Sequence, residues 1–204
     1  MTSLFLASSS QSRQQLLRDA GFSFEILKTS AESEPFETTA SLEQNVKAAA
    51  IFKAKTVVLP TPKDSPQTIC VITADTLIAD VAENILQKPA DLAHAHEQLR
   101  QLRAGMCTIG TAVVIQKLAH SRDNDWKRIE SEYIYSESHA EFYVPDEQFD
   151  AYFSQLPFAL HACGSGIIES FGAQFLKSFQ GSYTGALGLS MFEVAAALKK
   201  LGYK

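Results

Sequence analysis

Three residues near the start of the chain have side chains suited to binding an anion. Ser8, Ser10 and Arg13 lie in the stretch LASSSQSRQQLL, where a short apolar segment runs into a serine-rich turn and then a helical pattern. The N–H groups and dipole of a helix start attract negative charge, serine hydroxyls donate to phosphate oxygens, and a guanidinium binds phosphate through two parallel hydrogen bonds. Serines are also common helix caps, and in that interpretation Arg13 is an ordinary solvent-exposed cation.

A second set combines one acidic residue with two isolated lysines. Asp75 follows the β-branched run TICVITA, so we expect it where a buried strand ends, which is where ligands bind in open α/β sheets. A carboxylate there can hold Mg²⁺ or take a proton from water. Lys53 lies in IFKAK, and Lys88 precedes Pro89, which keeps its backbone extended and can aim its charge at a phosphate. The alternatives are a turn-forming aspartate and two surface lysines.

Further carboxylates could complete such a site. Glu32 and Glu34 lie in an acidic segment containing proline and could join Asp75 around a metal ion, although such a pair is equally typical of a solvated loop. Glu169 follows the glycine-rich ACGSGII, whose small residues let the backbone approach a ligand closely. Its carboxylate could accept hydrogen bonds from a purine edge; the alternative is an exposed glutamate beside a glycine-rich turn.

Alternating strands and helices must position these residues. Hydrophobic patterning predicts strands at 3–7, 22–27, 68–80, 107–118 and 129–144. It predicts helices at 11–21, 42–58, 89–103, 145–156 and 194–202, and a glycine-rich, then strand-like segment at 161–179. The central strand is expected to end near Asp75. This order indicates an α/β fold: a mixed twisted sheet with flanking helices and a hairpin in the middle.

Local signals refine three of the helices. Ser41 with Gln44, and Ser190 with Glu193, have the spacing of helix capping boxes. The helix at 89–103 is expected to present an apolar side formed by Leu92, His96, Leu99 and Leu102.

The composition is that of an ordinary globular protein and excludes several function classes. Of 204 residues, 46% are apolar and 20% charged, and 18 Lys and Arg against 23 Asp and Glu give a net charge of −5. An acidic balance argues against coating a nucleic-acid duplex. The opening apolar run is too short for a signal peptide or a membrane span, and three widely spaced cysteines show no metal-site spacing. We therefore expect one cytoplasmic domain over residues 1–204, without nucleic-acid or membrane partners.

Several short motifs follow one another in an informative order. The stretch LASSSQSRQQLL is similar to the pattern LAS-x-SPRR-x-x-LL, and Lys53 with Ala54 falls on a K-A pair. ADT at 74–76 matches an ADT signature, and ILQKP, which contains Lys88, is similar to I-L-G-K-P. In this order the motifs resemble the Maf family of nucleoside triphosphate pyrophosphatases over nearly the whole chain. The resemblance implies a Maf/ITPase-like domain with two lobes around a central cleft, and a homodimer as a possible assembly.

The resemblance also implies a reaction and a set of residue roles. Water would attack between the α- and β-phosphates of a nucleoside triphosphate, giving a nucleoside monophosphate and pyrophosphate with the help of a divalent cation, Mg²⁺ or Mn²⁺. Asp75 corresponds to the proton acceptor. The phosphates would be contacted by Ser8, Arg13, Lys53 and Lys88. The family's base-selecting positions fall on Ser12, Thr76 and Glu169. The metal would be held by Asp75 together with Glu32 or Glu34.

Departures from the family pattern point to one branch and keep other functions open. Gln11 and Ser12 replace the Pro and first Arg of SPRR, and ACGSGIIESFG is similar to C-A-G-S-F-K-S-E-G-F-G of the subfamily acting on 7-methyl-GTP, with Glu169 and Phe171 aligned. We therefore expect 7-methyl-GTP as substrate, because a carboxylate favours its cationic ring. The stretch GSYTGALGLS lacks the Asp, Asn and Pro of the family pattern. The alternatives are a nucleotide-binding regulatory relative with little turnover and a different phosphohydrolase on a similar sheet.

Overall fold

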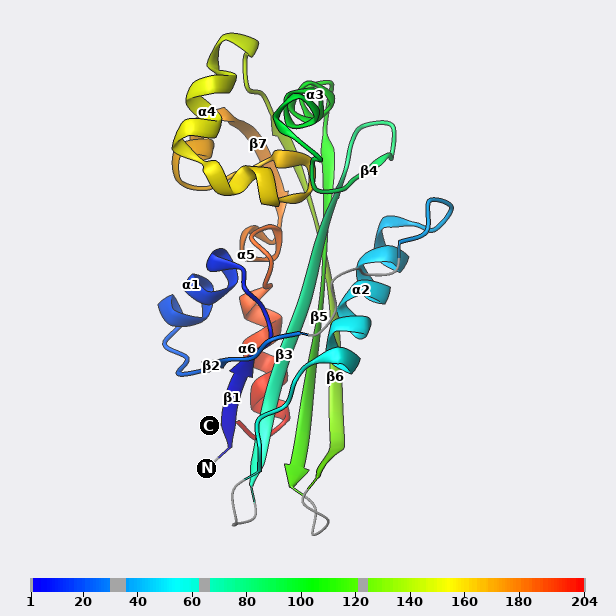
Figure 1. Ribbon diagram of the computed structural model, residues 1–204, viewed down its shortest axis with the longest axis vertical. Coiled ribbons are helices and arrows are strands. Elements are labelled where there is room, and N and C mark those ends of the chain that lie inside the picture. Colours follow the sequence, from blue (N-terminus) through cyan, green and yellow to red (C-terminus); the bar gives the residue numbers. More distant parts are fainter. Residues whose placement is uncertain (1, 30–35, 63–66, 121–124, 204) are drawn as a thin grey trace. The chain divides into compact units, whose positions relative to one another are not determined.

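The chain divides into two compact units in the computed structural model, which describes residues 2–29, 36–62, 67–120 and 125–203 (Figure 1). Unit 1 comprises Met1–Asp75, Thr111–Tyr135 and Gly188–Lys204, and unit 2 comprises Thr76–Gly110 and Ser136–Leu187. None of the helices in the described ranges has the length and apolar character that a membrane crossing requires.

A mixed sheet runs through the chain, and its described strands follow the order β2-β1-β3-β5-β6-β7, with β4 paired to β3. The strands are β1 (Ser3–Leu6), β2 (Glu25–Ile26), β3 (Thr68–Ala79), β4 (Ile85–Leu86), β5 (Cys107–His120), β6 (Trp126–Phe142) and β7 (Leu176–Gly181). β1 is parallel to β2 and β3, whereas β4 and β7 are antiparallel to β3 and β6. The expected hairpin strands β5 and β6 are neighbours.

Helices flank this sheet, which confirms the predicted α/β class. They are α1 (Gln11–Asp19), α2 (Leu42–Thr56), α3 (Leu92–Leu102), α4 (Phe149–Gln155), α5 (Tyr183–Ala186) and α6 (Met191–Lys200). Short 3₁₀ turns are η1 (Asp146–Gln148), η2 (Pro157–His161), η3 (Cys163–Ser165) and η4 (Ser170–Phe175). The central cleft and the single domain over residues 1–204 stay predictions.

The helix starts confirm one capping prediction and correct another. Ser41 accepts a hydrogen bond from the Gln44 N–H and the Gln44 side chain accepts one from Ser41, so the capping box at α2 is present. Ser190 stands at the start of α6, but its side chain makes no capping bond. The predicted box with Glu193 is therefore wrong, because the Ser190 hydroxyl is buried away from the helix N–H groups.

Unit 1 has a helical layer on each face of β3, as Figure 1 shows for α2 on one side and α6 on the other. Cys70, Ile72 and Ala74 point to the face that carries Leu17 of α1 and the apolar side of α6. The intervening residues point to α2, because side chains alternate along a strand. The buried Thr73 hydroxyl, for example, donates to the Ala50 carbonyl at 3.2 Å. This alternation decides which side chains of β3 can face a site and which must remain core.

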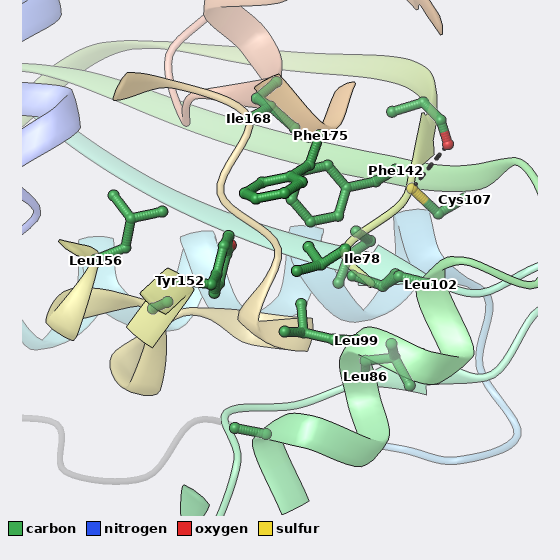
Figure 2. Packing of buried hydrophobic residues seen from close by; sticks show 14 of the residues in the cluster. Ile78, Leu86, Leu99, Leu102, Cys107, Phe142, Tyr152, Leu156, Ile168 and Phe175 are labelled. Atoms are coloured by element: carbon green, nitrogen blue, oxygen red, sulfur yellow. Dashed lines mark hydrogen bonds between the residues drawn. The ribbon is translucent and has the colours of Figure 1, made fainter. Parts of the chain in front are cut away.

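Unit 2 has its own apolar core, in which helices and 3₁₀ turns pack on the sheet. Figure 2 shows Ile78, Leu99 and Leu102 beneath the rings of Phe142 and Phe175, with Tyr152 to one side. The Cys107 thiol donates to the Ala140 carbonyl at 3.1 Å, and burial raises the pKa of this thiol to about 11.

One sequence expectation in unit 2 needs correction. Leu92 is 46% exposed, so the predicted apolar side of α3 is rotated: its buried residues are Ala95, Gln98, Leu99 and Leu102.

The segment 161–179 is glycine-rich and then extended, as expected, because β7 begins at Leu176. Before β7 the segment contains η3 and η4, with left-handed backbone at Gly164, Ser165 and Ser170.

Candidate active site

The end of β1 and the start of α1 hold an arginine in a fixed position. Arg13 is only 9% exposed, and its Nε donates to the Gly188 carbonyl at 3.0 Å. Its Nη1 donates to the Ser8 hydroxyl oxygen at 3.3 Å, and that oxygen also accepts the Ser10 N–H at 3.2 Å. Ser10 in turn caps α1 by accepting the Arg13 N–H. The predicted pair of Ser8 and Arg13 is therefore close together in unit 1.

The plainer interpretation of this serine-rich turn is right for Ser10 and wrong for Arg13, and phosphate binding here stays a prediction. Ser10 is a helix cap, as the plainer interpretation held. Arg13 is not solvent-exposed, however, because the carbonyl of Gly188 and the hydroxyl of Ser8 hold it within the fold. A guanidinium fixed by the backbone beside a helix start is preorganised for a phosphate, since little side-chain freedom is lost on binding.

The second cluster joins α2 to β3. Lys53, in the last turn of α2, has its Nζ 2.6 Å from a carboxylate oxygen of Asp75, and the two side chains are 17% and 12% exposed. The hydrogen bond from the Thr73 hydroxyl to the Ala50 carbonyl lies about one helical turn before Lys53 and fixes the position of α2 along β3. Asp75 follows Thr73 on the same face of the strand, so its carboxylate meets the lysine.

The position of Asp75 on the sheet differs from the prediction in one respect. β3 does not end near Asp75 but runs on to Ala79, because Ile78 and Ala79 pair with β4. What ends there is the parallel neighbour: β1 stops at Leu6, opposite Ile72, and the last bond between the two strands runs from the Ala7 N–H to the Ile72 carbonyl. Asp75 therefore lies just past the carboxyl end of β1, the edge at which ligands bind in such sheets.

The other residues predicted to contact the nucleotide are divided between the two units. Ser12 is half-buried in the first turn of α1, in unit 1. Thr76, Lys88 and Glu169 belong to unit 2. Lys88 is exposed next to β4, and Glu169 is half-buried just before η4. The charge of Glu169, together with burial as the larger cause, raises the pKa of Tyr183.

Among the described residues of unit 1, Asp75 is a suitable oxygen donor for a divalent cation. The predicted metal ligands Glu32 and Glu34 lie outside the described residues, and within the described ranges no three His, Cys, Asp or Glu side chains cluster as a metal site. Mg²⁺ at a nucleotide characteristically takes one or two carboxylates and completes its shell with phosphates and water. Asp75 fits this kind of site.

Some polar contacts of the fold were not predicted from the sequence. The Gly188 carbonyl that fixes Arg13 lies 175 positions away in the sequence, and no local pattern connects the two. Gln98 is buried in α3 within an apparently apolar helix face. An amide on the same helix face as Ala95, Leu99 and Leu102 is a sequence signal that could have indicated a buried hydrogen-bonded residue. Asp80 accepts the N–H groups of Ala82 and Asn84 and so holds the turn that follows β3.

Comparison with known proteins gives consistent matches along the chain. A family model described as Maf-like protein matches residues 3–201. The dTTP/UTP pyrophosphatase of Escherichia coli strain K12 is 32% identical over 197 residues, covering 95% of this chain and 90% of that protein. A dTTP/UTP pyrophosphatase from Caldicellulosiruptor bescii is 31% identical over 204 residues, covering 100% and 96%. A solved nucleoside-triphosphatase / dITP/XTP pyrophosphatase from Mycobacterium abscessus aligns over 98% of this chain and 94% of its own at 16% identity, with a TM-score of 0.36.

Proposed function

The chain belongs to the Maf family, and we propose that it is a nucleoside triphosphate pyrophosphatase that releases a nucleoside monophosphate and pyrophosphate. The observation that carries the proposal is the ion pair of Lys53 and Asp75 just past the end of β1. A carboxylate held by a lysine at this edge combines a proton acceptor with a cation for a phosphate. Relatives named as pyrophosphatases support the reaction class.

The residues of unit 1 suit the steps of such a hydrolysis. Asp75 accepts a proton from the attacking water as the new P–O bond forms. The anhydride bond between the α- and β-phosphates breaks, and its electron pair leaves on the bridging oxygen with pyrophosphate. Lys53, Arg13 and Ser8 balance the negative charge of the phosphates, which is the main requirement of phosphoryl chemistry. Lys53 can exchange its bond to Asp75 for a phosphate oxygen, leaving the carboxylate to act on water.

A divalent cation, Mg²⁺ or Mn²⁺, belongs to the same proposal. When bound it would supply charge neutralisation for the triphosphate. Asp75 is the described residue that would hold it, and Glu32 or Glu34 stays a predicted second ligand.

The base preference has two candidates, each favoured by a different observation. Two of the relatives are named dTTP/UTP pyrophosphatase, which supports a preference for pyrimidine nucleotides. Glu169 favours 7-methyl-GTP, because its carboxylate is half-buried near Tyr183 and would attract a cationic methylated ring. Ser12, Thr76 and Lys88 keep their expected roles as further nucleotide contacts.

Pyrophosphate release across a nucleotide panel tests the proposal. dTTP, UTP, 7-methyl-GTP and GTP are each assayed with Mg²⁺ and with Mn²⁺, and phosphate is measured alongside. We expect pyrophosphate from at least one of them, and a loss of roughly 10²–10⁴-fold in Asp75→Asn. Asp19→Asn is the matched control, because Asp19 is an exposed carboxylate on α1 bonded to Gln15. Phosphate as the product identifies a different phosphohydrolase, and binding without turnover identifies the regulatory alternative.

Glu169→Gln separates the two base candidates. If Glu169 selects a cationic base, this variant lowers the ratio of 7-methyl-GTP to GTP turnover and leaves dTTP and UTP turnover within a factor of two, a change of about 0.4 kcal/mol. An unchanged ratio would show that Glu169 does not read the base.

A further inference from the structure

Gln98 is a fully buried polar residue in an otherwise apolar helix face. It is 1% exposed and stands in α3 between Ala95 and Leu99, which line the core of unit 2. Burying a side-chain amide is unfavourable unless both its donor and acceptor are satisfied, and an apolar residue of similar size fills such a place without that requirement. We therefore expect the amide at this position to have hydrogen-bond partners for both its NH₂ group and its oxygen.

Both ends of the Gln98 amide connect segments that carry predicted nucleotide contacts. Its Nε2 donates to the Gln87 carbonyl at 2.7 Å, and Gln87 immediately precedes Lys88. Its Oε1 accepts the Ser165 hydroxyl at 3.0 Å, and Ser165 lies in the turn that leads to Glu169. The Gly164 N–H donates to the same Gln87 carbonyl at 3.2 Å, so the two segments are also joined directly.

The chain of hydrogen bonds continues past Ser165. Its carbonyl accepts the Tyr152 hydroxyl at 2.8 Å, and that hydroxyl oxygen accepts the Ile167 N–H at 2.8 Å. Gly164 and Ser165 both have left-handed backbone, with φ values of 69° and 57°. Such a conformation is unfavourable for serine and persists only when its surroundings hold it. The network holds this turn in its observed conformation, four residues before Glu169.

We propose that Gln98 is a positioning residue that fixes the Lys88 segment and the Glu169 turn to one another, and thereby sets nucleotide affinity and base preference. The inference rests on the proposed function for the roles of Lys88 and Glu169. Lys88 and Gln98 also line one cavity of about 360 Å³ in unit 2, together with Gln87 and His94. Loss of the amide removes two of the hydrogen bonds that join the segments and leaves only the direct bond from the Gly164 N–H to the Gln87 carbonyl at 3.2 Å. A displacement near 1 Å is enough to weaken binding severely.

Gln98→Met tests the link with a side chain of similar length, because it removes both hydrogen bonds and keeps the apolar volume. Ser165→Ala breaks one bond only and is the milder variant if Gln98→Met folds poorly. The matched control is Ser138→Ala. Ser138 is a buried serine of unit 2 whose hydroxyl donates to the Ser182 carbonyl at 2.9 Å.

Affinity is measured by calorimetry with two probes that are not hydrolysed by α–β cleavage: α,β-methylene dTTP, which has a base, and α,β-methylene tripolyphosphate, which has none. We expect Gln98→Met to weaken both about tenfold, through the Lys88 segment. Ser165→Ala should weaken the nucleotide several-fold more than the base-free probe, through the Glu169 turn. Ser138→Ala should change either affinity less than twofold.

Equal losses of affinity in Gln98→Met and Ser138→Ala would overturn the inference, since both would then report only on stability. Parallel losses of both probes in Ser165→Ala would overturn its specificity part. Absence of wild-type binding to either probe would overturn it altogether. These outcomes are separate from the proposed function, because wild-type pyrophosphate release tests the reaction and analogue binding does not require turnover.

Discussion

A double-mutant cycle on Lys53 and Asp75 tests whether their ion pair stabilises the fold in addition to its proposed role in catalysis. The three variants are Lys53→Met, Asp75→Asn and the combination of both. Each single variant removes one charge of a pair whose side chains are only 17% and 12% exposed, so the remaining charge loses this ion pair. The double variant removes both charges and keeps approximately the same volume.

The separation of the two charges sets the expected magnitude. At 2.6 Å and an effective dielectric constant of about 20, the Coulomb attraction is about 6 kcal/mol. Desolvation of both groups offsets a large part of this attraction. We therefore expect a net coupling free energy of about 1–3 kcal/mol, with each single variant less stable than the double variant.

Urea unfolding followed by Trp126 fluorescence measures this coupling. Trp126 is the only tryptophan of the chain, and its Nε1 donates to the Pro60 carbonyl in unit 1 at 2.7 Å. The control cycle uses Lys200 and Glu132, which lie 2.8 Å apart in unit 1 with Lys200 70% exposed. Exposed pairs of this kind contribute about 0.2–1 kcal/mol. A Lys53–Asp75 coupling no larger than the control would refute the electrostatic reasoning.

The same variants separate a structural role of Asp75 from a chemical one. If Asp75 only balances the charge of Lys53, the double variant releases pyrophosphate at least as fast as Lys53→Met alone. If Asp75 accepts the proton, the double variant regains stability and stays at least about 10²-fold less active than Lys53→Met. Equal activity of the double variant and Lys53→Met would contradict the proposed role.

Three further predictions concern other parts of the chain. Arg13→Lys loses the guanidinium that bonds both the Gly188 carbonyl and the Ser8 hydroxyl, so we expect KM for the nucleotide to rise about tenfold in steady-state kinetics. The control Arg18→Lys changes an exposed arginine and should leave KM unchanged. Burial raises the pKa of the Cys107 thiol from 9.0 to about 11, so its contribution to stability is complete below pH 9 and is lost as the pH rises to 11. That loss amounts to about 2–3 kcal/mol. In urea unfolding measured at a series of pH values, the free-energy difference between wild type and Cys107→Ala should therefore be constant below pH 9 and change between pH 9 and 11. Gly164→Ala places a Cβ 2.5 Å from Ile78 Cγ2 at a φ of 69°, so its midpoint of thermal unfolding should fall by several degrees, and an unchanged midpoint would contradict the packing described.

Local patterns sufficed to predict most elements and the residue types of the site in unit 1. The capping box at Ser41 fixes the start of α2, and the β-branched run identifies β3. Together these place Lys53 and Asp75 on elements that turn out to be neighbours. The strand end was misplaced because the apolar run continues past Asp75, and only pairing with β4 decides where β3 stops.

Interactions between distant segments could not be predicted in this way. The rotation of α3 depends on which side chains its neighbours place against it: His96 stacks on Phe153 and has a tilted contact with Phe149, while Leu92 is exposed. Gln98 is buried because Gln87 and Ser165 satisfy its amide, and neither partner is close to it in sequence. Periodicity identifies an apolar side of a helix, but it does not show which polar residue finds partners there.

The register between β1 and β3 couples the core of unit 1 to its candidate site. A shift of one residue would turn Asp75 toward the layer of Ile72 and Ala74, which is apolar, and would turn Ile72 toward Lys53. Burying an unpaired carboxylate there is far more costly than exposing a methyl group, so the aspartate opposes the slipped register more strongly than any apolar residue of the strand. The residue proposed to act on water therefore also specifies the pairing that positions it, and variants of Asp75 should be compared at equal measured stability.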